Sequence, residues 1–340
     1  MRMRQLGKDG PLVSVLGLGG WKAGGSWVYG LGEVDDSQSI ATIRRALDAG
    51  VNWVDTAPVY GAGRSEEVVG QALRGRDDVL VNTKCGHHLA ADGKSTYVDN
   101  SPARIRAECE ASMRRLGREH IDIYQFHLPD VRHPIEESWA GMLELVEEGK
   151  VRWPGASNFD VTMLTRCEEL GHVQVTEPQY NLMHREIELE LLPWCARTGT
   201  GVVPYELQQT GLLSGSFSHE RLAALPADDF RRGFTDFQEP LISRALALVD
   251  RLGPLAAELD VSVGELAIAY ALARPGVTGC IVGASSPDQV DGWIGAGDLA
   301  LDGEMVDRVT KIAVDAGFPT AGQAGYTSVD ARVAGSPDSA

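Results

Sequence analysis

The sequence predicts a single (β/α)8 barrel, the TIM-barrel fold, and three observations support this prediction. Short apolar runs alternate with helical segments eight times along about 300 residues. The runs are too uniformly apolar to be strands with one wet face, which is typical of parallel strands buried on both sides. No G-x-G-x-x-G motif follows the first run. A closed barrel therefore fits better than an open, doubly wound sheet.

The elements can be assigned in order from the amino terminus. Residues 1–13 form a β-hairpin, with Lys-Asp-Gly as its turn. Helices are recognised by apolar spacing and by caps, as in the Ser262-x-x-Glu265 capping box. The predicted strands are 15–18, 51–54, 79–83, 121–126, 151–155, 173–176, 201–204 and 277–282. The predicted helices are 37–49, 66–74, 102–116, 135–148, 161–170, 187–197, 261–273 and 287–296.

Two segments lie outside the repeat. Residues 206–240 form a long connection after the seventh strand, and a connection of that length in a compact domain is usually functional. Residues 318–340 are rich in Gly, Ala, Ser and Pro and are expected to be a partly disordered tail. We therefore predict one barrel domain over residues 1–317.

Composition narrows the class of protein. A hydrophobic content of 43% and a charged content of 23% are ordinary for a globular protein. No run reaches transmembrane length and the N-terminus has no signal-peptide core, which predicts a cytoplasmic protein. The net charge of −17 argues against nucleic acid and anionic membranes as partners. The five cysteines are scattered and include no C-x-x-C pair, which predicts buried free thiols.

Four reactive side chains follow three adjacent strands of the predicted barrel. Asp55 and Tyr60 follow the second strand, Lys84 the third and His127 the fourth. Each has an ordinary explanation when taken alone: a turn cap, loop packing, a solvated charge or a hydrogen-bonded imidazole. Because barrel enzymes carry their chemistry at the carboxyl ends of the strands, the four together favour a catalytic site.

Carbonyl reduction, or its reverse, suits these four side chains. An alkoxide that forms on hydride transfer needs a proton, and a phenol with an ordinary pKa near 10 can supply it if a cation stabilises the phenolate. Tyr60 would be this acid, Lys84 the cation, and Asp55 the partner that holds Lys84 in place. His127 could polarise the carbonyl or share the proton. A nicotinamide would carry the hydride.

Several stretches resemble the aldo-keto reductases, in an order and at a spacing that extend from residue 1 to about residue 300. These stretches are LGLGGW, DTAPVYGAGRSEEVVG, NTKCG, IDIYQFHLPD, GKVRWPGASNF, EPQYNLMHREIE, QTGLLSGSF and IVGASSPDQV. The subgroup resembles bacterial enzymes that act on sugars, inositols or small aldehydes.

This resemblance implies site residues. It assigns catalysis to the same four residues that the strand ends gave: Asp55, Tyr60, Lys84 and His127. It implies nicotinamide contacts from Ser157, Asn158 and Gln179, with Tyr205 stacked on the ring. The other cofactor residues that it implies follow the seventh and eighth strands: Glu206, Gly211, Leu213, Gly283, Ser285 and Gln289.

The sequence departs from the family pattern where the cofactor phosphates are expected. Glu206 replaces a small polar residue, and Ser216 replaces the usual lysine. No arginine or lysine lies between Arg274 and Arg308, although charge-assisted bonds are the strong ones to a 2′-phosphate. The cofactor is therefore predicted to be NADP(H) or NAD(H), with the preference left open.

The substrate pocket is predicted from aromatic and imidazole side chains at the barrel mouth. The candidates are Trp21, Trp27, Tyr29 and His87, whereas Trp53, inside a strand, is expected in the core. His87 and His88 suggest a metal, but adjacent residues of an extended segment point opposite ways and a third ligand is not evident. We predict no metal.

Three functions remain compatible with the sequence. The first is an oxidoreductase that interconverts a carbonyl and an alcohol with a nicotinamide cofactor. The second is net non-redox chemistry, an epimerisation or elimination, on a sugar-like substrate. The third is a non-catalytic binding protein. The expected partner is a small carbonyl or sugar-like molecule, and the sequence is compatible with an oligomer.

Overall fold

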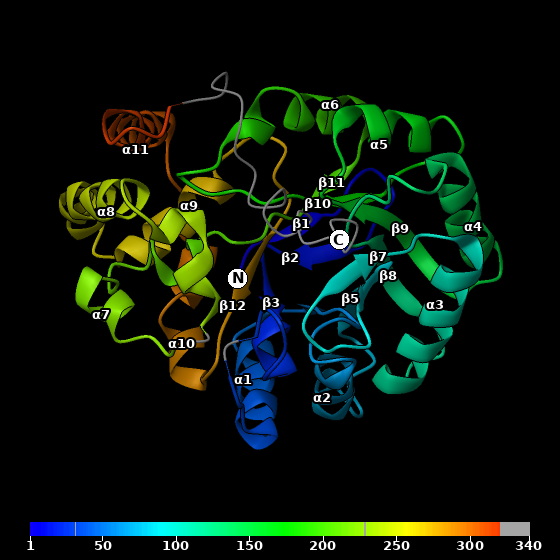
Figure 1. The fold of residues 1–340 in the computed structure, drawn as a ribbon. Coiled ribbons are helices and arrows are strands. Elements are labelled where there is room, and N and C mark those ends of the chain that lie inside the picture. Colours follow the sequence, from blue (N-terminus) through cyan, green and yellow to red (C-terminus); the bar gives the residue numbers. More distant parts are fainter. Residues whose placement is uncertain (31, 228, 320–340) are drawn as a thin grey trace.

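Eight parallel strands form a barrel with helices around it (Figure 1). The structure is a computed structural model that describes residues 1–30, 32–227 and 229–319. Neighbouring strands pair in the order β11-β10-β9-β8-β5-β4-β3-β12, and the amide of Ile281 donates to Pro204 O at 2.9 Å to join the two ends. The predicted barrel is confirmed. Its strands are β3 (Leu16–Gly19), β4 (Trp53–Asp55), β5 (Leu80–Cys85), β8 (Ile121–Phe126), β9 (Val151–Ser157), β10 (Val175–Glu177), β11 (Gly201–Val202) and β12 (Cys280–Gly283).

The predicted N-terminal hairpin closes one end of the barrel. Strands β1 (Met3–Gln5) and β2 (Leu12–Ser14) pair antiparallel. Leu6 and Val13 pack in one cluster with Trp53, whose indole Nε1 donates to Ser14 O at 2.9 Å. A Cβ on Gly17 would lie 2.2 Å from that indole, so only glycine fits there. Trp53 is 1% exposed, which confirms its placement in the core.

The helices follow the predicted alternation, with two corrections. A 3₁₀ turn, Glu186–Glu188, replaces the start of the predicted helix 187–197, and the α-helix begins only at Leu191. The predicted helix 287–296 is interrupted after Asp291, where Gly292 supplies little helix propensity, and continues as a 3₁₀ turn, Ile294–Gly297. The helices that match the prediction are α1 (Asp36–Asp48), α2 (Arg64–Ala72), α3 (Pro102–Leu116), α4 (Ile135–Glu147), α5 (Val161–Glu168), α6 (Leu191–Thr198), α9 (Val263–Leu272) and α10 (Pro287–Asp291).

Three further elements were not predicted. A hairpin of β6 (His87–Leu89) and β7 (Thr96–Val98) follows β5 at the barrel mouth. Helices α8 (Leu241–Glu258) and α11 (Gly303–Asp315) contact each other on the outside of the barrel (Figure 1). Each of these helices bears an apolar face, but neither is needed to complete the eight β/α units.

The described residues of the 206–240 connection form short helical segments. These are 3₁₀ turns at Gln209–Gly211, Phe230–Gly233 and Thr235–Phe237, and α7 (His219–Ala223). The connection reaches across to the loop after β3, where the Phe230 ring meets Trp21 edge-on at a centroid distance of 5.4 Å. The predicted tail beyond residue 319 lies outside the described residues, and the domain boundary at 317 stays a prediction.

Two further properties concern the cysteines and the membrane. All five cysteines are buried and free, as predicted. In the part of the chain that the structure describes, no helix has both the length and the apolar character to cross a membrane.

Candidate active site

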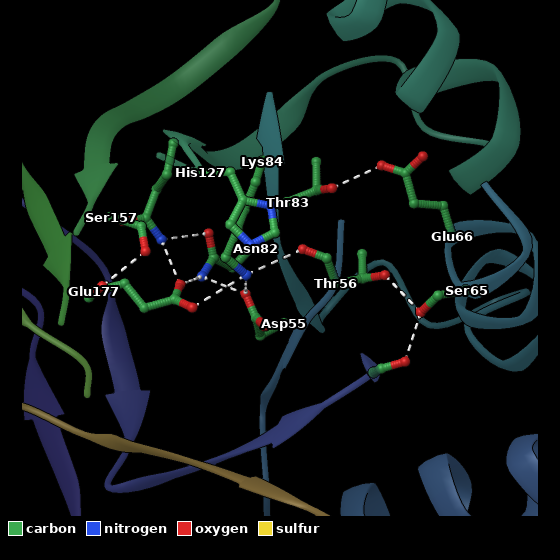
Figure 2. A network of polar contacts seen from close by, with 12 residues as sticks. Asp55, Thr56, Ser65, Glu66, Asn82, Thr83, Lys84, His127, Ser157 and Glu177 are labelled. Atoms are coloured by element: carbon green, nitrogen blue, oxygen red, sulfur yellow. Dashed lines mark hydrogen bonds and ion pairs between the residues drawn. The ribbon is translucent and has the colours of Figure 1, made fainter. Parts of the chain in front are cut away.

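Lys84 lies at the centre of a buried ionic cluster inside the barrel (Figure 2). Its Nζ donates to Asp55 Oδ1 at 2.5 Å and lies 3.1 Å from Glu177 Oε1. The three side chains come from β5, β4 and β10, and all are at most 3% exposed. Lys84 also donates to Thr56 O at 3.2 Å. The ammonium is therefore fixed by two carboxylates and a carbonyl.

Two amide side chains complete this cluster below Lys84. Asn82 Nδ2 donates to Asp55 Oδ1 at 2.9 Å and to Glu177 Oε2 at 3.1 Å. Gln125 Nε2 donates to Glu177 Oε2 and to Asn82 Oδ1, each at 2.9 Å. The alternation along β5 places Asn82 and Lys84 on the same inner face. Because these amides have fixed partners, the carboxylates cannot turn away from Lys84.

The cluster shifts the pKa values of its members. Burial raises the pKa of the Asp55 carboxyl well above its usual range, and the nearby charge of Glu177 adds to this, whereas Lys84 opposes it. Burial alone would lower the pKa of Lys84, but Asp55 and Glu177 together raise it above its ordinary value. Lys84 is thus charged at any physiological pH.

Tyr60 lies above Lys84 in the loop after β4. Lys84 Nζ is 5.6 Å from the centre of the phenol ring, which is 9% exposed. Burial raises the pKa of Tyr60, although the charge of Lys84 pulls it down. The loop packs closely here, because a Cβ on Gly61 would lie 2.0 Å from Gly24 O. This contact explains the glycine directly after Tyr60.

Two imidazoles lie beside Tyr60. The His127 ring, after β8, meets Tyr60 edge-on at 5.6 Å and His87 edge-on at 5.0 Å. His88 faces the other way, 3.1 Å from Glu108 and stacked on Tyr97. Its neighbour His87 therefore faces the catalytic cluster alone, as the alternation of an extended segment predicts.

Of the predicted nicotinamide contacts, Ser157, Asn158 and Tyr205 lie next to this cluster. Asn158 Nδ2 donates to His127 O at 3.0 Å, and Tyr205 OH donates to Asn158 Oδ1 at 2.8 Å. Ser157 Oγ donates to Glu177 O at 2.7 Å. Asn158 has a φ of 62°, a conformation that asparagine tolerates better than most residues. The three polar groups form one continuous ledge beside His127.

Gln179 forms a parallel backbone bridge with Tyr205 of this ledge, and its side chain contacts the 206–240 connection. Its Nε2 donates to Glu206 Oε2 at 2.8 Å and to Gln209 Oε1 at 3.2 Å, both in the 206–240 connection. Glu206, one of the departures from the family pattern, accepts this hydrogen bond with its carboxylate. The predicted contacts Gly211 and Leu213 follow in the same connection, Gly211 with a φ of 98° and Leu213 fully buried.

The predicted phosphate end is a cavity of about 410 Å³ between the β3–α1 and β12–α10 loops. Ser285 N and Oγ donate to Gln289 Oε1 at 2.9 and 3.0 Å, and Lys22 Nζ donates to the same oxygen at 3.3 Å. Gly283 precedes this loop as the last residue of β12. Glu33 and Asp35 also line the cavity.

Lys22 is a cation that sequence analysis did not find. It makes no ion pair with any described residue, and burial, Arg231 and Arg221 lower its pKa to about 8. It lies 267 positions before Gln289, so nothing in the local sequence could pair the two. A half-buried cation without a carboxylate partner, among hydroxyl and amide groups, fits an anionic phosphate.

Aromatic side chains line the mouth above Tyr60. Trp27 lies 5.6 Å from Tyr60 and 5.6 Å from Tyr29, measured between ring centres. Trp21 is held by Phe230 of the 206–240 connection. The four predicted substrate residues are therefore connected around Tyr60: Trp21 and Trp27 pack against its cluster, Tyr29 contacts Trp27, and His87 contacts His127.

The comparisons with known proteins identify the family. The model of the Aldo/keto reductase family matches residues 15–314. The chain belongs to the aldo/keto reductase family. It is 36% identical to aldo-keto reductase YhdN of Bacillus subtilis, over 86% of this chain and 87% of that one. It is 33% identical to the NADH-specific methylglyoxal reductase of Escherichia coli, over 85% and 91%. The solved glycerol dehydrogenase AKR11B4 of Gluconobacter oxydans matches with a TM-score of 0.85 and 34% identity, over 96% and 99%.

This aldo-keto reductase is an oxidoreductase that interconverts carbonyls and alcohols with a nicotinamide cofactor. Its residues fit that cofactor: the polar ledge lies beside Tyr60, and Lys22 supplies a free cation at the phosphate end. Sequence analysis missed Glu177, Asn82 and Gln125 as members of the site. A signal for Glu177 existed, because it directly follows the predicted strand 173–176.

Proposed function

We propose that this enzyme reduces a small hydroxylated aldehyde or ketone with NADH, with Tyr60 as the general acid. The observation that carries the proposal is the position of the Tyr60 phenol between the Lys84 ammonium and the His127 imidazole. When Tyr60 is replaced by phenylalanine, NADH-dependent reduction should be lost while NADH binding persists. Unchanged turnover would refute this role.

Four residues have separate roles in the reduction of the carbonyl. The raised pKa of Tyr60 keeps its proton on the phenol at neutral pH, ready for the developing alkoxide. Lys84 stabilises the phenolate that remains, and Asp55 fixes Lys84. His127 orients the carbonyl oxygen toward the phenol. The bound nicotinamide supplies the hydride. Ser157, Asn158 and Tyr205 would hold its ring, with Gln179 behind them.

The phosphate end favours NAD(H) over NADP(H). Lys22 is the one cation among the described residues that line the cavity, and it suffices for a pyrophosphate. A 2′-phosphate would add charge beside Glu33 and Asp35, and Arg231 and Arg221, which act on Lys22, do not line the cavity. The similar Escherichia coli reductase is NADH-specific. Fluorescence titration should give a dissociation constant for NADH at least about tenfold below that for NADPH; equal affinities would contradict the preference.

The mouth favours a small, oxygen-rich substrate. Its aromatic walls leave His87 and His127 as the polar groups nearest to Tyr60, and these can bond a hydroxyl or carbonyl next to the reacting carbon. The similar proteins include a methylglyoxal reductase and a glycerol dehydrogenase. We expect higher kcat/KM for methylglyoxal and glyceraldehyde than for benzaldehyde, and the reverse order would exclude this substrate class.

No observation favours net non-redox chemistry or a purely binding role, the other two functions compatible with the sequence. A small carbonyl compound remains the expected partner, and the cytoplasm the expected compartment.

A further inference from the structure

Glu177 places a second carboxylate against Lys84. Lys84 Nζ lies 2.5 Å from Asp55 and 3.1 Å from Glu177, and Asn82 Nδ2 donates to both carboxyls at 2.9 and 3.1 Å. One ammonium is enough to balance Asp55. The charge of Glu177 is therefore the part of the cluster that needs an explanation.

The balance of charge requires one more proton. With both carboxylates ionised, the cluster would hold a net negative charge in a place where Asp55, Lys84 and Glu177 are at most 3% exposed. Two like charges that share a buried site do not both ionise readily. Asn82 and Gln125 face the pair as neutral amides. Tyr60 and Tyr205 are the phenols nearby, and the His127 ring meets Tyr60 edge-on at 5.6 Å. The amides and the phenols add no positive charge to balance the second carboxylate.

We propose that Asp55 and Glu177 share one proton beside Lys84, and that this proton restores Tyr60 through Lys84 after Tyr60 has protonated the substrate. Glu177 is in this scheme a positioning residue that stores a proton. The scheme rests on the proposed function for its catalytic part, but the shared proton can be tested without turnover.

The transfers balance as follows. The O–H bond of Tyr60 breaks, and its proton forms the O–H bond of the product alcohol. A proton of Lys84 Nζ then moves to the phenolate, and the carboxyl proton replaces it on Nζ. The hydride and its electron pair come from the reduced nicotinamide of the proposed function. The carboxyl pair is left with one negative charge more. A proton from solvent refills the pair after release of the products.

Infrared spectroscopy of the cofactor-free protein tests the shared proton. At neutral pH the protein should show the C=O stretch of a protonated carboxyl group, and either Glu177→Gln or Asp55→Asn should remove it. Either substitution leaves a single carboxylate, which Lys84 keeps ionised. Glu66→Gln is the matched control. Glu66 is also fully buried, but it pairs with Arg115 and Thr83 and does not share its cation with a second described carboxylate. This variant should keep the band. A wild-type spectrum without the band overturns the proposal, whatever the enzyme reduces.

A proton inventory tests the relay. In mixtures of light and heavy water, the reduction rate of the wild type should depend on deuterium content along a curve, since several protons move. Glu177→Gln should give a straight line and a kcat lowered about tenfold at neutral pH, with KM changed less than about twofold. Glu177→Asp should restore the curve in part. If Glu177→Gln leaves the curve unchanged, the relay is wrong; if it does not fold, the wild-type spectrum and Glu177→Asp still decide.

Discussion

The two ends of the active site are built differently. At the catalytic end, Lys84 is almost fully buried and is fixed by Asp55 and Glu177, whose own strands hold them in place. At the phosphate end, Lys22 is half-buried in a loop, where it donates to the neutral side chain of Gln289. Charges fixed in a low-dielectric core act strongly on a neighbouring proton, whereas charges at a wet rim act weakly. The groups that transfer the proton are therefore held rigidly at the catalytic end. At the phosphate end, substitutions can change the preference for NADH or NADPH.

The largest effect is expected at Tyr60. Replacement by phenylalanine removes the proton donor and should lower kcat for carbonyl reduction by about 10² to 10⁴-fold. Lys84 and His127 keep their other contacts, so NADH affinity should stay within about twofold. Steady-state kinetics and a fluorescence titration measure the two quantities. Parallel losses of kcat and NADH affinity would show that Tyr60 serves binding instead.

Lys84→Met tests how much the catalytic end depends on its buried cation. Removing one partner of a buried ionic cluster should lower the free energy of unfolding by about 3–5 kcal/mol. Without the ammonium, nothing opposes the burial that raises the pKa of Asp55, so its folded pKa rises further above the unfolded one. Such groups stabilise the fold below their unfolded pKa and lose that contribution as pH rises. The loss should therefore be smallest in acid and grow toward neutral pH.

Urea unfolding across this pH range measures the effect. Lys150→Met is the matched control, because Lys150 pairs with Glu110 and Glu148 at the surface with 27% of its side chain exposed. It should cost at most about 1 kcal/mol at any pH. Equal losses in the two variants would show that the Lys84 cluster adds no special stability.

The same contrast explains what could be predicted from the sequence. Strand ends meet at one rim of a barrel, so positions at the end of a strand or in the loop that follows it are enough to bring Asp55, Tyr60, Lys84 and His127 together. Glu177 could have been found in the same way, since it directly follows the predicted sixth strand, but the residue chosen there was Gln179. The structure places that glutamine against Glu206.

The phosphate end gave no comparable signal. Lys22 and Gln289 meet only because β3 pairs with β12, the first barrel strand with the last. A search for cations close to Gln289 along the chain therefore finds none. The hairpin β6–β7 and helices α8 and α11 were missed for a related reason. These elements are additions to the eight β/α units, so the repeat that predicts the barrel does not predict them.

Gln289→Arg, at the phosphate end, should change the relative affinity for NADPH and NADH. Gln289 is exposed at the cavity rim, and a guanidinium there can form charge-assisted bonds to a 2′-phosphate. One such bond should tighten NADPH binding about tenfold and change NADH binding less than about twofold. Asp288→Asn, next in the chain and also exposed, changes charge by the same amount without a donor fork and serves as the control. A similar gain in both variants would show a general charge effect in place of a phosphate contact.

The smallest effect concerns pH and Lys22. The pKa of its ammonium is lowered to about 8 by burial and by Arg231 and Arg221, so its positive charge is lost as pH rises through that value. The dissociation constant for NADH should therefore rise between neutral and alkaline pH, by less than about fivefold because the site is partly screened by water. Lys22→Met should already bind NADH weakly at neutral pH and show a flat dependence. Isothermal titration calorimetry at several pH values measures both curves, and a slope that persists in Lys22→Met would assign the pH dependence to another group and leave the phosphate end without its proposed cation.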